Sequence, residues 1–350
     1  MAFLAMRPRC NLTAVVFMSN RIHRSIRALP AAIVLASLAH SPMHGQAPSG
    51  RKAWTVPRTP DGRPDLQGIW DFKSATPLER PARFAGREFM TPAEAAAYQQ
   101  EALEREDGRP PDDGRSEPSV HPAWWLDYGK SPVKTLRTSL IVDPPDGKIP
   151  PLSPEGQQRA AARRAAARTH GPADSYENRS LQERCITRGL PEVILPGPYN
   201  NNLQIVQAPG YVMLLTEMIH DARIVPMDGR PHNSPEVRQW MGDPRGRWDG
   251  DTLIVETVNF TDKTNFRGSG ANLHLVERFT RVDADTIDYR FTVDDPTTWT
   301  RPWTVAYPIV KTEGPIYEFA CHEANYGLMD ILTGARWEEK AAAEQTKKKQ

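Results

Sequence analysis

Short runs in which apolar and polar residues alternate dominate the chain from residue 199 onward. A period of two is typical of a strand with one buried face. The runs are separated by turn sequences, among them APG at 208–210, DG at 249–250 and DAD at 283–285. Short joints of this kind indicate antiparallel hairpins. The predicted strands are NLQIVQ, YVMLLTEMIH, ARIVPM, RQWMGD, GRWDG, DTLIVETVNF, LHLVERFTRV, TIDYRFTVDD, WTVAYPIVK and IYEFACHE.

This meander predicts a mainly β fold. Long open sheet edges invite aggregation, so a meander of this length closes into a barrel or folds into a sandwich. The sequence GIW at Gly68–Trp70, on a predicted first strand, resembles the Gly-x-Trp of lipocalins. We therefore expect a lipocalin- or calycin-like antiparallel barrel over residues 181–330, with a β-sandwich as the alternative.

Three further stretches predict helices. Residues 91–94 read Thr-Pro-Ala-Glu, which supplies an N-cap, a proline in the first turn and a capping-box acid. Residues 153–171 start with Ser-Pro, and their face of Ala and Arg indicates a surface helix. We therefore assign 48–180 to a Pro-rich segment with one strand and two helices, and 331–350 to a C-terminal helix and tail.

The first 47 residues read as a signal peptide. Arg21, Arg24 and Arg27 precede the apolar run 28–39, and small residues follow up to a cleavage site near Ala47. The run is too short to span a bilayer, which takes about 20 helical residues. We predict an exported periplasmic or extracellular protein without a stable membrane anchor.

Export changes the charge and the cysteine chemistry. Removal of residues 1–47 leaves 39 of the 44 basic residues against all 43 acidic ones, a net charge of −4. This balance does not favour nucleic acid binding, which needs a basic surface. Cys185 and Cys321 remain, and in an oxidising compartment we expect them to form a disulfide, with two buried thiols as the alternative.

Several long motifs occur in order along the chain: PDLQGIW, YNNNLQIVQAPGYVMLLTE, DARIVPMDGRPH, GRWDGDTLIVETVNFTD, LHLVERFTRVDADTIDYRFTVDDPTTWTRPW and YEFACHEANYG. Through them the chain resembles a widespread family of mostly uncharacterised exported bacterial proteins, over most of residues 54–330. The resemblance implies export but no activity, so function has to be argued from individual residues.

Alternation assigns a face to each ionisable residue in VMLLTEMIHDARIV, residues 212–225. The face that contains His220 is otherwise almost wholly apolar, so we predict that it faces the core. Glu217, Asp221 and Arg223 share the opposite face, where they form a solvated charge cluster or line a site.

The other predicted strands add inward-facing groups. Glu277 is a carboxylate on an apolar face, and Glu323 shares a face with Cys321. An apolar cavity with few polar groups is the usual form of a small-molecule site, and a filled barrel is the alternative. The inward aromatic residues, which we predict to bind a ligand, are Tyr289, Phe291, Trp303, Tyr307 and Tyr317.

Three functions fit this interior. The first is binding of a small apolar or aromatic molecule, oriented by His220, Glu277 and Tyr317. The second is a cofactor-free hydrolase, lyase or isomerase, with Glu277 or Glu323 as acid or base and His220 as its partner. In that enzyme Arg223 or Tyr317 would stabilise developing negative charge. The third is a structural or surface-interaction protein in which every charge is structural.

The sequence contains only weak signals for a metal site or for a nucleophilic residue. Four histidines fall in the β-rich region, without His-x-His or His-x-x-x-His spacing, so we predict neither a metal site nor a cofactor. No Gly-x-Ser-x-Gly supports a serine nucleophile. Asp294 and Asp295 face opposite sides of a strand and indicate a turn at its end.

Overall fold

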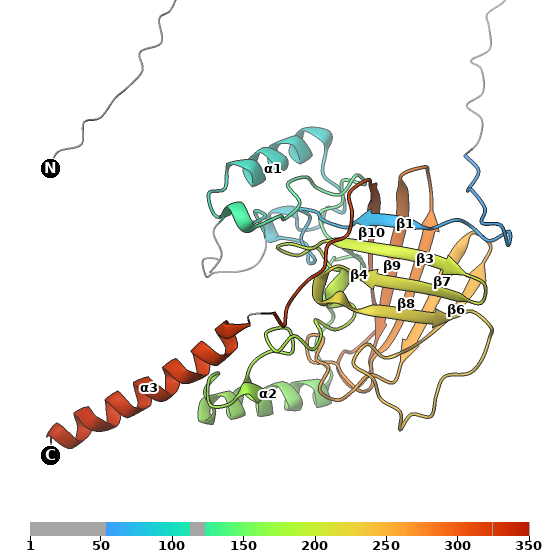
Figure 1. The fold of residues 1–350 in the computed structure, drawn as a ribbon. Coiled ribbons are helices and arrows are strands. Elements are labelled where there is room, and N and C mark those ends of the chain that lie inside the picture. The colour runs from blue at the N-terminus through green and yellow to red at the C-terminus, as the bar shows by residue number, and fades with distance from the viewer. Residues whose placement is uncertain (1–53, 113–122, 324, 350) are drawn as a thin grey trace, which may run out of the picture. The chain divides into compact units, whose positions relative to one another are not determined.

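The computed structural model describes residues 54–112, 123–323 and 325–349, so the predicted signal peptide lies outside the described residues. In these ranges ten strands form one antiparallel sheet, in the order β5-β4-β3-β1-β10-β9-β8-β7-β6 with β2 beside β10 (Figure 1). The predicted mainly β fold is confirmed. The strands are β1 (Gly68–Asp71), β2 (Ile141–Asp143), β3 (Asn202–Ala208), β4 (Tyr211–Thr216), β5 (Ala222–Pro226), β6 (Asp243–Asp249), β7 (Thr252–Val258), β8 (His274–Arg281), β9 (Thr286–Asp294) and β10 (Trp303–Thr312).

Short hairpin turns join β3 to β4, β6 to β7 and β8 to β9, as the turn sequences predict. Gly210 lies between β3 and β4, and Gly250 between β6 and β7, both at positive φ (79° and 55°), where glycine is favoured. The strand predicted around Trp70 becomes β1. It pairs with β3 on one side and β10 on the other, and so joins two meanders into one sheet.

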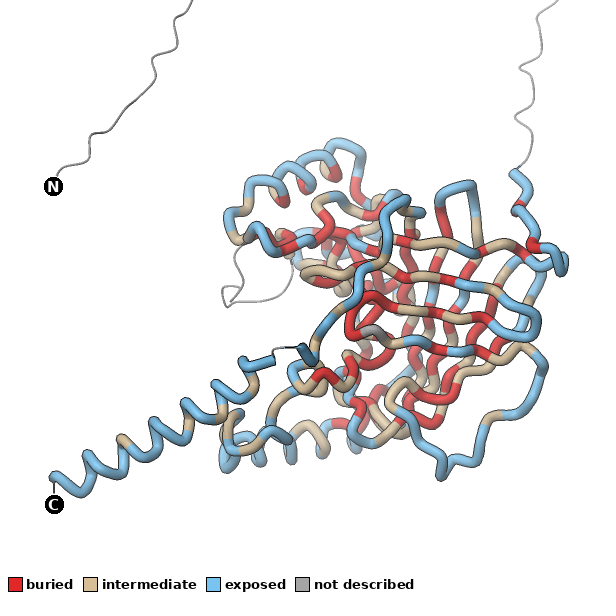
Figure 2. Tube along the Cα trace, in the orientation of Figure 1, coloured by how far each residue is buried: buried red, intermediate tan, exposed pale blue. Residues whose placement is uncertain are grey.

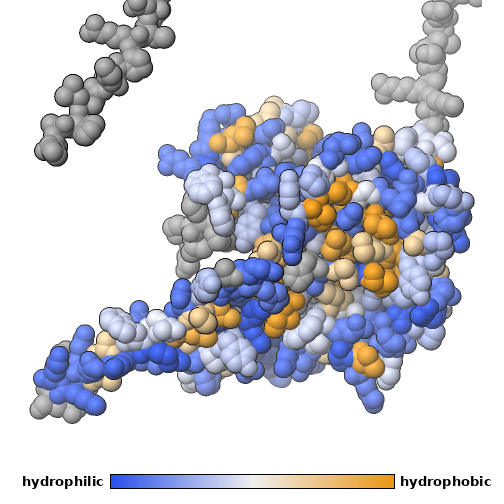
Figure 3. Space-filling view, in the orientation of Figure 1, coloured by the Kyte–Doolittle hydropathy of each residue, from blue (hydrophilic) through white to orange (hydrophobic). Residues whose placement is uncertain are grey.

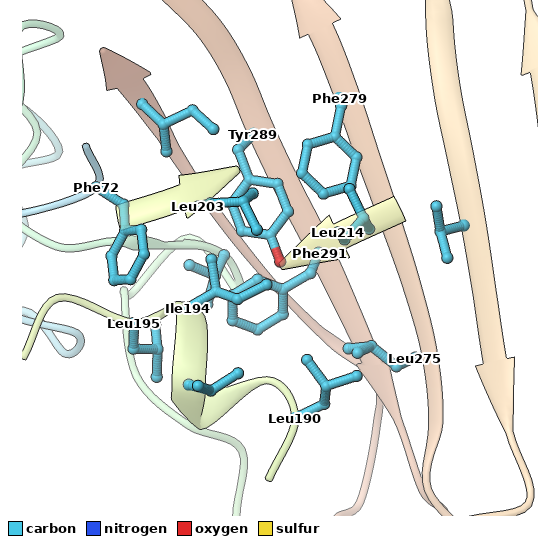
Figure 4. Close-up of a cluster of buried hydrophobic side chains, with 14 of the residues drawn as sticks. Phe72, Leu190, Ile194, Leu195, Leu203, Leu214, Leu275, Phe279, Tyr289 and Phe291 are labelled. Carbon is cyan, nitrogen blue, oxygen red and sulfur yellow. The ribbon is translucent and has the colours of Figure 1, made fainter. Parts of the chain in front are cut away.

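The main core lies between two layers of this one sheet. The sheet bends so that β3 and β4 cross in front of β8, β9 and β10 (Figure 1). Leu203 of β3 and Leu214 of β4 thereby meet Phe279 of β8 and Tyr289 and Phe291 of β9 (Figure 4). All five side chains are fully buried, which makes this region a packed apolar core.

The sheet is not closed by backbone pairing, because among the described strands its two end strands, β5 and β6, form no ladder with each other. They nevertheless pack together. A Cβ atom built on Gly246 of β6 would lie 2.2 Å from Sδ of Met227 and 2.8 Å from Cγ1 of Val225. The missing side chain at Gly246 therefore lets the two edges meet.

Two predicted strands are not strands in the structure. Residues 238–243 are irregular, except that Asp243 begins β6. Residues 316–323 are also irregular, because β10 already pairs with β1, β2 and β9 and offers no free side. The predicted disulfide is confirmed: Cys185 and Cys321 are bonded, with their Cα atoms 5.6 Å apart.

The helices lie outside the sheet. Helix α1 (Pro92–Glu104) has the predicted capping box, because Thr91 Oγ1 accepts a hydrogen bond from Glu94 N and Glu94 Oε2 accepts one from Thr91 N. It packs on a small separate core of Ala75, Phe84, Met90, Ala95, Tyr98 and Ala102. Short 3₁₀ helices are η1 (Ala82–Phe84), η2 (Ala123–Trp125), η3 (Tyr176–Asn178), η4 (Glu192–Ile194) and η5 (Met218–His220).

Helix α2 (Pro154–Thr169) is a surface helix, as predicted, with Gly156 as its buried residue. Gly156 is pressed against the backbone of Thr298, where an added Cβ would lie 2.5 Å from the carbonyl oxygen. Helix α3 (Tyr326–Lys349) is exposed along most of its length (Figure 2). No helix in the described ranges is long and apolar enough to cross a membrane.

The outer face of β3, β4 and β5 carries apolar side chains. Val206, Met213 and Ile224 are in register across the three strands, and Val206, Ile224 and nearby Tyr211 are exposed. Figure 3 shows apolar surface gathered over this part of the sheet. The outer face of this part of the sheet is thus partly apolar.

Candidate functional site

Three of the predicted site residues meet inside the core. Arg223 of β5 donates two hydrogen bonds to Glu277 of β8, from Nη1 to Oε2 at 2.5 Å and from Nη2 to Oε1 at 3.0 Å. Tyr289 of β9 donates a third, from its hydroxyl to Glu277 Oε1 at 2.9 Å. The exposed fractions of Glu277, Arg223 and Tyr289 are 0, 3 and 0%. The glutamate is therefore held by a bidentate ion pair and a phenol, away from solvent.

The side chain of Glu277 faces inward, as predicted. Arg223 was predicted to face outward, and this prediction was wrong. Ile219, in η5 between β4 and β5, has φ of +60°. This left-handed residue lies in the connection after β4 and changes the phase of the alternation, so that Arg223 and Val225 are buried while Ala222 and Ile224 face outward. Glu217 was also expected outward. It is buried instead and accepts a hydrogen bond from Asn202 Nδ2 at 2.7 Å.

Burial and charge act on this cluster together. Burial lowers the pKa of Arg223, but the charge and hydrogen bonds of Glu277 outweigh it, so that the pKa is raised above its ordinary value. Burial and the negative charge of Glu277 raise the pKa of Tyr289 well above 10, and the same two causes raise that of Tyr307. Arg223 thus stays charged, and both phenols stay protonated, over the ordinary pH range.

The aromatic residues predicted to bind a ligand fill the interior. Tyr289, Phe291, Trp303 and Tyr307 are all buried in the main core. The ring of Tyr289 contacts that of Tyr307 edge-on, with centroids 5.5 Å apart, and Phe291 contacts Trp303 in the same way at 6.5 Å. None of the four lines either cavity described below.

Other predicted site residues lie elsewhere. Tyr317, expected to face inward, is 70% exposed, and Glu323 is exposed too, because residues 316–323 form no strand. These two residues are therefore not brought to the buried cluster. The side chain of His220 is outside the description, so its predicted role as a base or ligand contact stays a prediction.

The structure offers a different cavity, which we call the basic cleft. It has a volume of about 790 Å³ and lies between residues 177–192 and residues 240 and 263–266. Its apolar wall comes from Leu181, Leu190, Trp240 and Phe266. Its charged side chains are Arg179, Arg184, Arg188 and Lys263 against Glu177 and Glu192. The cleft is therefore cationic, although the chain after residue 47 has a net negative charge.

The segment that carries these arginines is held on both sides. The disulfide of Cys185 anchors it to residue 321. Two residues further on, Thr187 Oγ1 donates to Asp221 Oδ2 at 2.8 Å and accepts from Gly189 N at 2.9 Å. Within the segment Arg179 pairs with Glu183, whereas exposed Lys263 on the opposite wall forms no ion pair among the described residues.

A neighbouring cavity of about 730 Å³ shares Arg188 and Glu192 with the basic cleft. We call it the second cavity. Its other walls come from residues 74–82, 105–112, 195–196 and Arg267, among others. Sequence reasoning missed both cavities. The available signal was the repeated arginine around Cys185, at positions 179, 184 and 188.

No group of three or more His, Cys, Asp or Glu placed to hold a metal ion occurs in the described part of the chain. The basic cleft itself is lined by three arginines and one lysine, whose donors suit anions. Comparison with family models, with curated proteins and with solved structures finds no match to this chain.

Proposed function

We propose that the protein is an exported small-molecule-binding protein, and that its ligand binds in the basic cleft rather than in the interior of the sheet. Export rests on the signal-like first 47 residues and on a disulfide, which persists in oxidising compartments. The curved antiparallel sheet then acts as a barrel-like scaffold that positions the cleft loops.

The charge of the cleft is the observation that carries this proposal. Four cationic side chains and two acidic ones surround a space of about 790 Å³, which is within the usual size of a small-molecule site. Beside them lie the aromatic side chains Trp240 and Phe266. This combination matches a ligand with an anionic group and an apolar or aromatic body.

The test compares phenylacetate with phenylacetamide, which has nearly the same shape without the charge. Titration is followed by calorimetry and by intrinsic tryptophan fluorescence, to which Trp240 in the cleft contributes. We expect the acid to bind at least about tenfold tighter, because charge-assisted hydrogen bonds contribute about 1.5–3 kcal/mol. Added salt should weaken binding of the acid and leave the amide unchanged.

Lys263→Gln should weaken phenylacetate binding about three- to tenfold, because the exposed lysine loses its charge. Lys347→Gln removes an equally exposed charge from α3, outside the cleft, and serves as the matched control. Equal affinity for the acid and the amide, or equal effects of the two variants, would overturn the proposal.

A further inference from the structure

The second cavity contains a buried cation, Arg80, that forms no ion pair with any residue the structure describes. Arg80 is 4% exposed and lines this cavity. Its Nε donates to Thr138 Oγ1 at 3.0 Å and its Nη1 to the carbonyl oxygen of Pro145 at 2.8 Å. Both acceptors are neutral, and among the described residues Nη2 has no hydrogen-bond partner.

The surrounding backbone fixes the position of the Arg80 side chain. The backbone N of Arg80 donates to Gly147 O at 2.8 Å. Gly147 has a φ of +70°, and a Cβ there would lie 2.5 Å from Ser139 Oγ and 3.2 Å from Cζ of Arg80. The glycine thus leaves room for a guanidinium group that the surrounding backbone fixes in place.

A buried charge is unfavourable unless an opposite charge or several hydrogen bonds compensate it. Three acids line the cavity, and each has a partner: Asp112 pairs with Arg83, and Glu192 lies 3.9 Å from Arg188. Glu79 accepts a hydrogen bond from Ile149 N at 3.0 Å. Lys148 and Arg267 add two more cations to the same wall. An anionic group from a ligand would supply the charge that the described residues do not.

The second cavity adjoins the basic cleft. Arg188 and Glu192 line both spaces, and the consecutive residues Phe266 and Arg267 line one each. The two spaces are therefore neighbours, and Arg188 and Glu192, with 3.9 Å between Nη2 and Oε1, lie at their common wall.

Resting on the proposed function of the basic cleft, we propose that the ligand is an elongated organic dianion, with one anionic group in the cleft and the other at Arg80 in the second cavity. The middle of such a molecule would pass Arg188 and Glu192. The chemical class is that of an α,ω-dicarboxylate or a similar chain with an acid at each end.

The test uses the full chain and compares pairs of equal length: suberate with octanoate, and sebacate with decanoate. We expect the diacid of at least one pair to bind about tenfold tighter or more, because it gains a second charge-assisted contact. In Arg80→Gln the diacid should fall to the affinity of the monoacid, while monoacid binding stays at the wild-type level and shows that the cleft is intact.

If Arg80→Gln does not fold, Lys148→Gln combined with Arg267→Gln should reduce the preference for the diacid. Lys134→Gln, an exposed lysine that lines neither cavity, is the control and should leave the preference unchanged. Equal binding of diacid and monoacid would overturn the dianion proposal and leave the cleft proposal standing. Binding of neither acid would also overturn the dianion proposal, and the phenylacetate titration would then decide on the cleft proposal.

Discussion

Glu277 places its carboxylate in the middle of an apolar core, where Arg223 and Tyr289 supply its hydrogen bonds. Such a pair contributes little by itself, because desolvation of both ions offsets their attraction. Removal of one partner is different, since it leaves a buried charge uncompensated. This asymmetry makes the cluster a sensitive point of the fold.

Glu277→Gln should therefore destabilise the protein by about 3–5 kcal/mol, because Arg223 stays buried without a carboxylate. Tyr289→Phe, which keeps the ion pair and removes one hydrogen bond, should cost about 1–3 kcal/mol. Denaturant unfolding followed by tryptophan fluorescence measures both. If Glu277→Gln were as stable as the wild type, the cluster would not be held as described.

For single residues, the alternating pattern predicts which side chains face inward as long as the strand is not interrupted. Alternation along β8 placed Glu277 inward correctly, with Leu275 and Phe279 buried on the same face. It failed for Arg223, because a single left-handed residue, Ile219, lies between β4 and β5. A β-branched residue rarely adopts positive φ, so nothing in the local sequence signals this change of phase.

Among the elements, β5 and β6 show how two sheet edges can meet without a ladder. The contact needs a residue without a side chain on β6, since Val225 and Met227 occupy the space beside Gly246. Gly246 lies within strand β6 and not in a turn. A glycine inside a strand otherwise weakens the sheet.

Gly246→Ala should cost about 1–3 kcal/mol, because the new methyl group overlaps Val225 and forces the two strands apart. Gly314→Ala is a suitable control, since the nearest atom to its added Cβ, Thr312 Oγ1, is 3.7 Å away. Thermal unfolding of the two variants, compared with the wild type, measures the difference. Equal melting temperatures would mean that the edges are not in contact in solution.

Hairpins were predicted well because their turns carry local signals, such as the glycines at 210 and 250. Residues 316–323 have the same alternation of apolar and polar residues but form no strand. A strand also needs the free edge of another strand to pair with. Whether an edge is free depends on the whole sheet. The sequence of the segment alone does not contain that information.

For the molecule as a whole, the disulfide links the arginine-bearing side of the basic cleft to the segment that follows β10. Cys185 and Cys321 are 136 residues apart. Their even number in an oxidising compartment predicted the bridge, but not what the bridge positions. The cleft itself was not predictable, because it is formed by irregular segments whose arrangement depends on tertiary contacts.

Replacement of both cysteines by serine should lower stability by about 4–5 kcal/mol, on the basis of the long loop that the bridge closes. The same variant should bind phenylacetate more weakly, because Arg184 and Arg188 lose their anchor. Denaturant unfolding and calorimetric titration measure the two effects. Unchanged phenylacetate affinity in a variant that still folds would show that the bridge does not position the cleft.

The long span of this bridge also sets an order of assembly. Residue 321 is synthesised after every strand of the sheet and after all residues that line the basic cleft. The covalent link can therefore close only after every strand has been synthesised, and only where thiols are oxidised. In a reducing compartment the arginine segment would lack this anchor, so the proposed binding site would be completed only after oxidation.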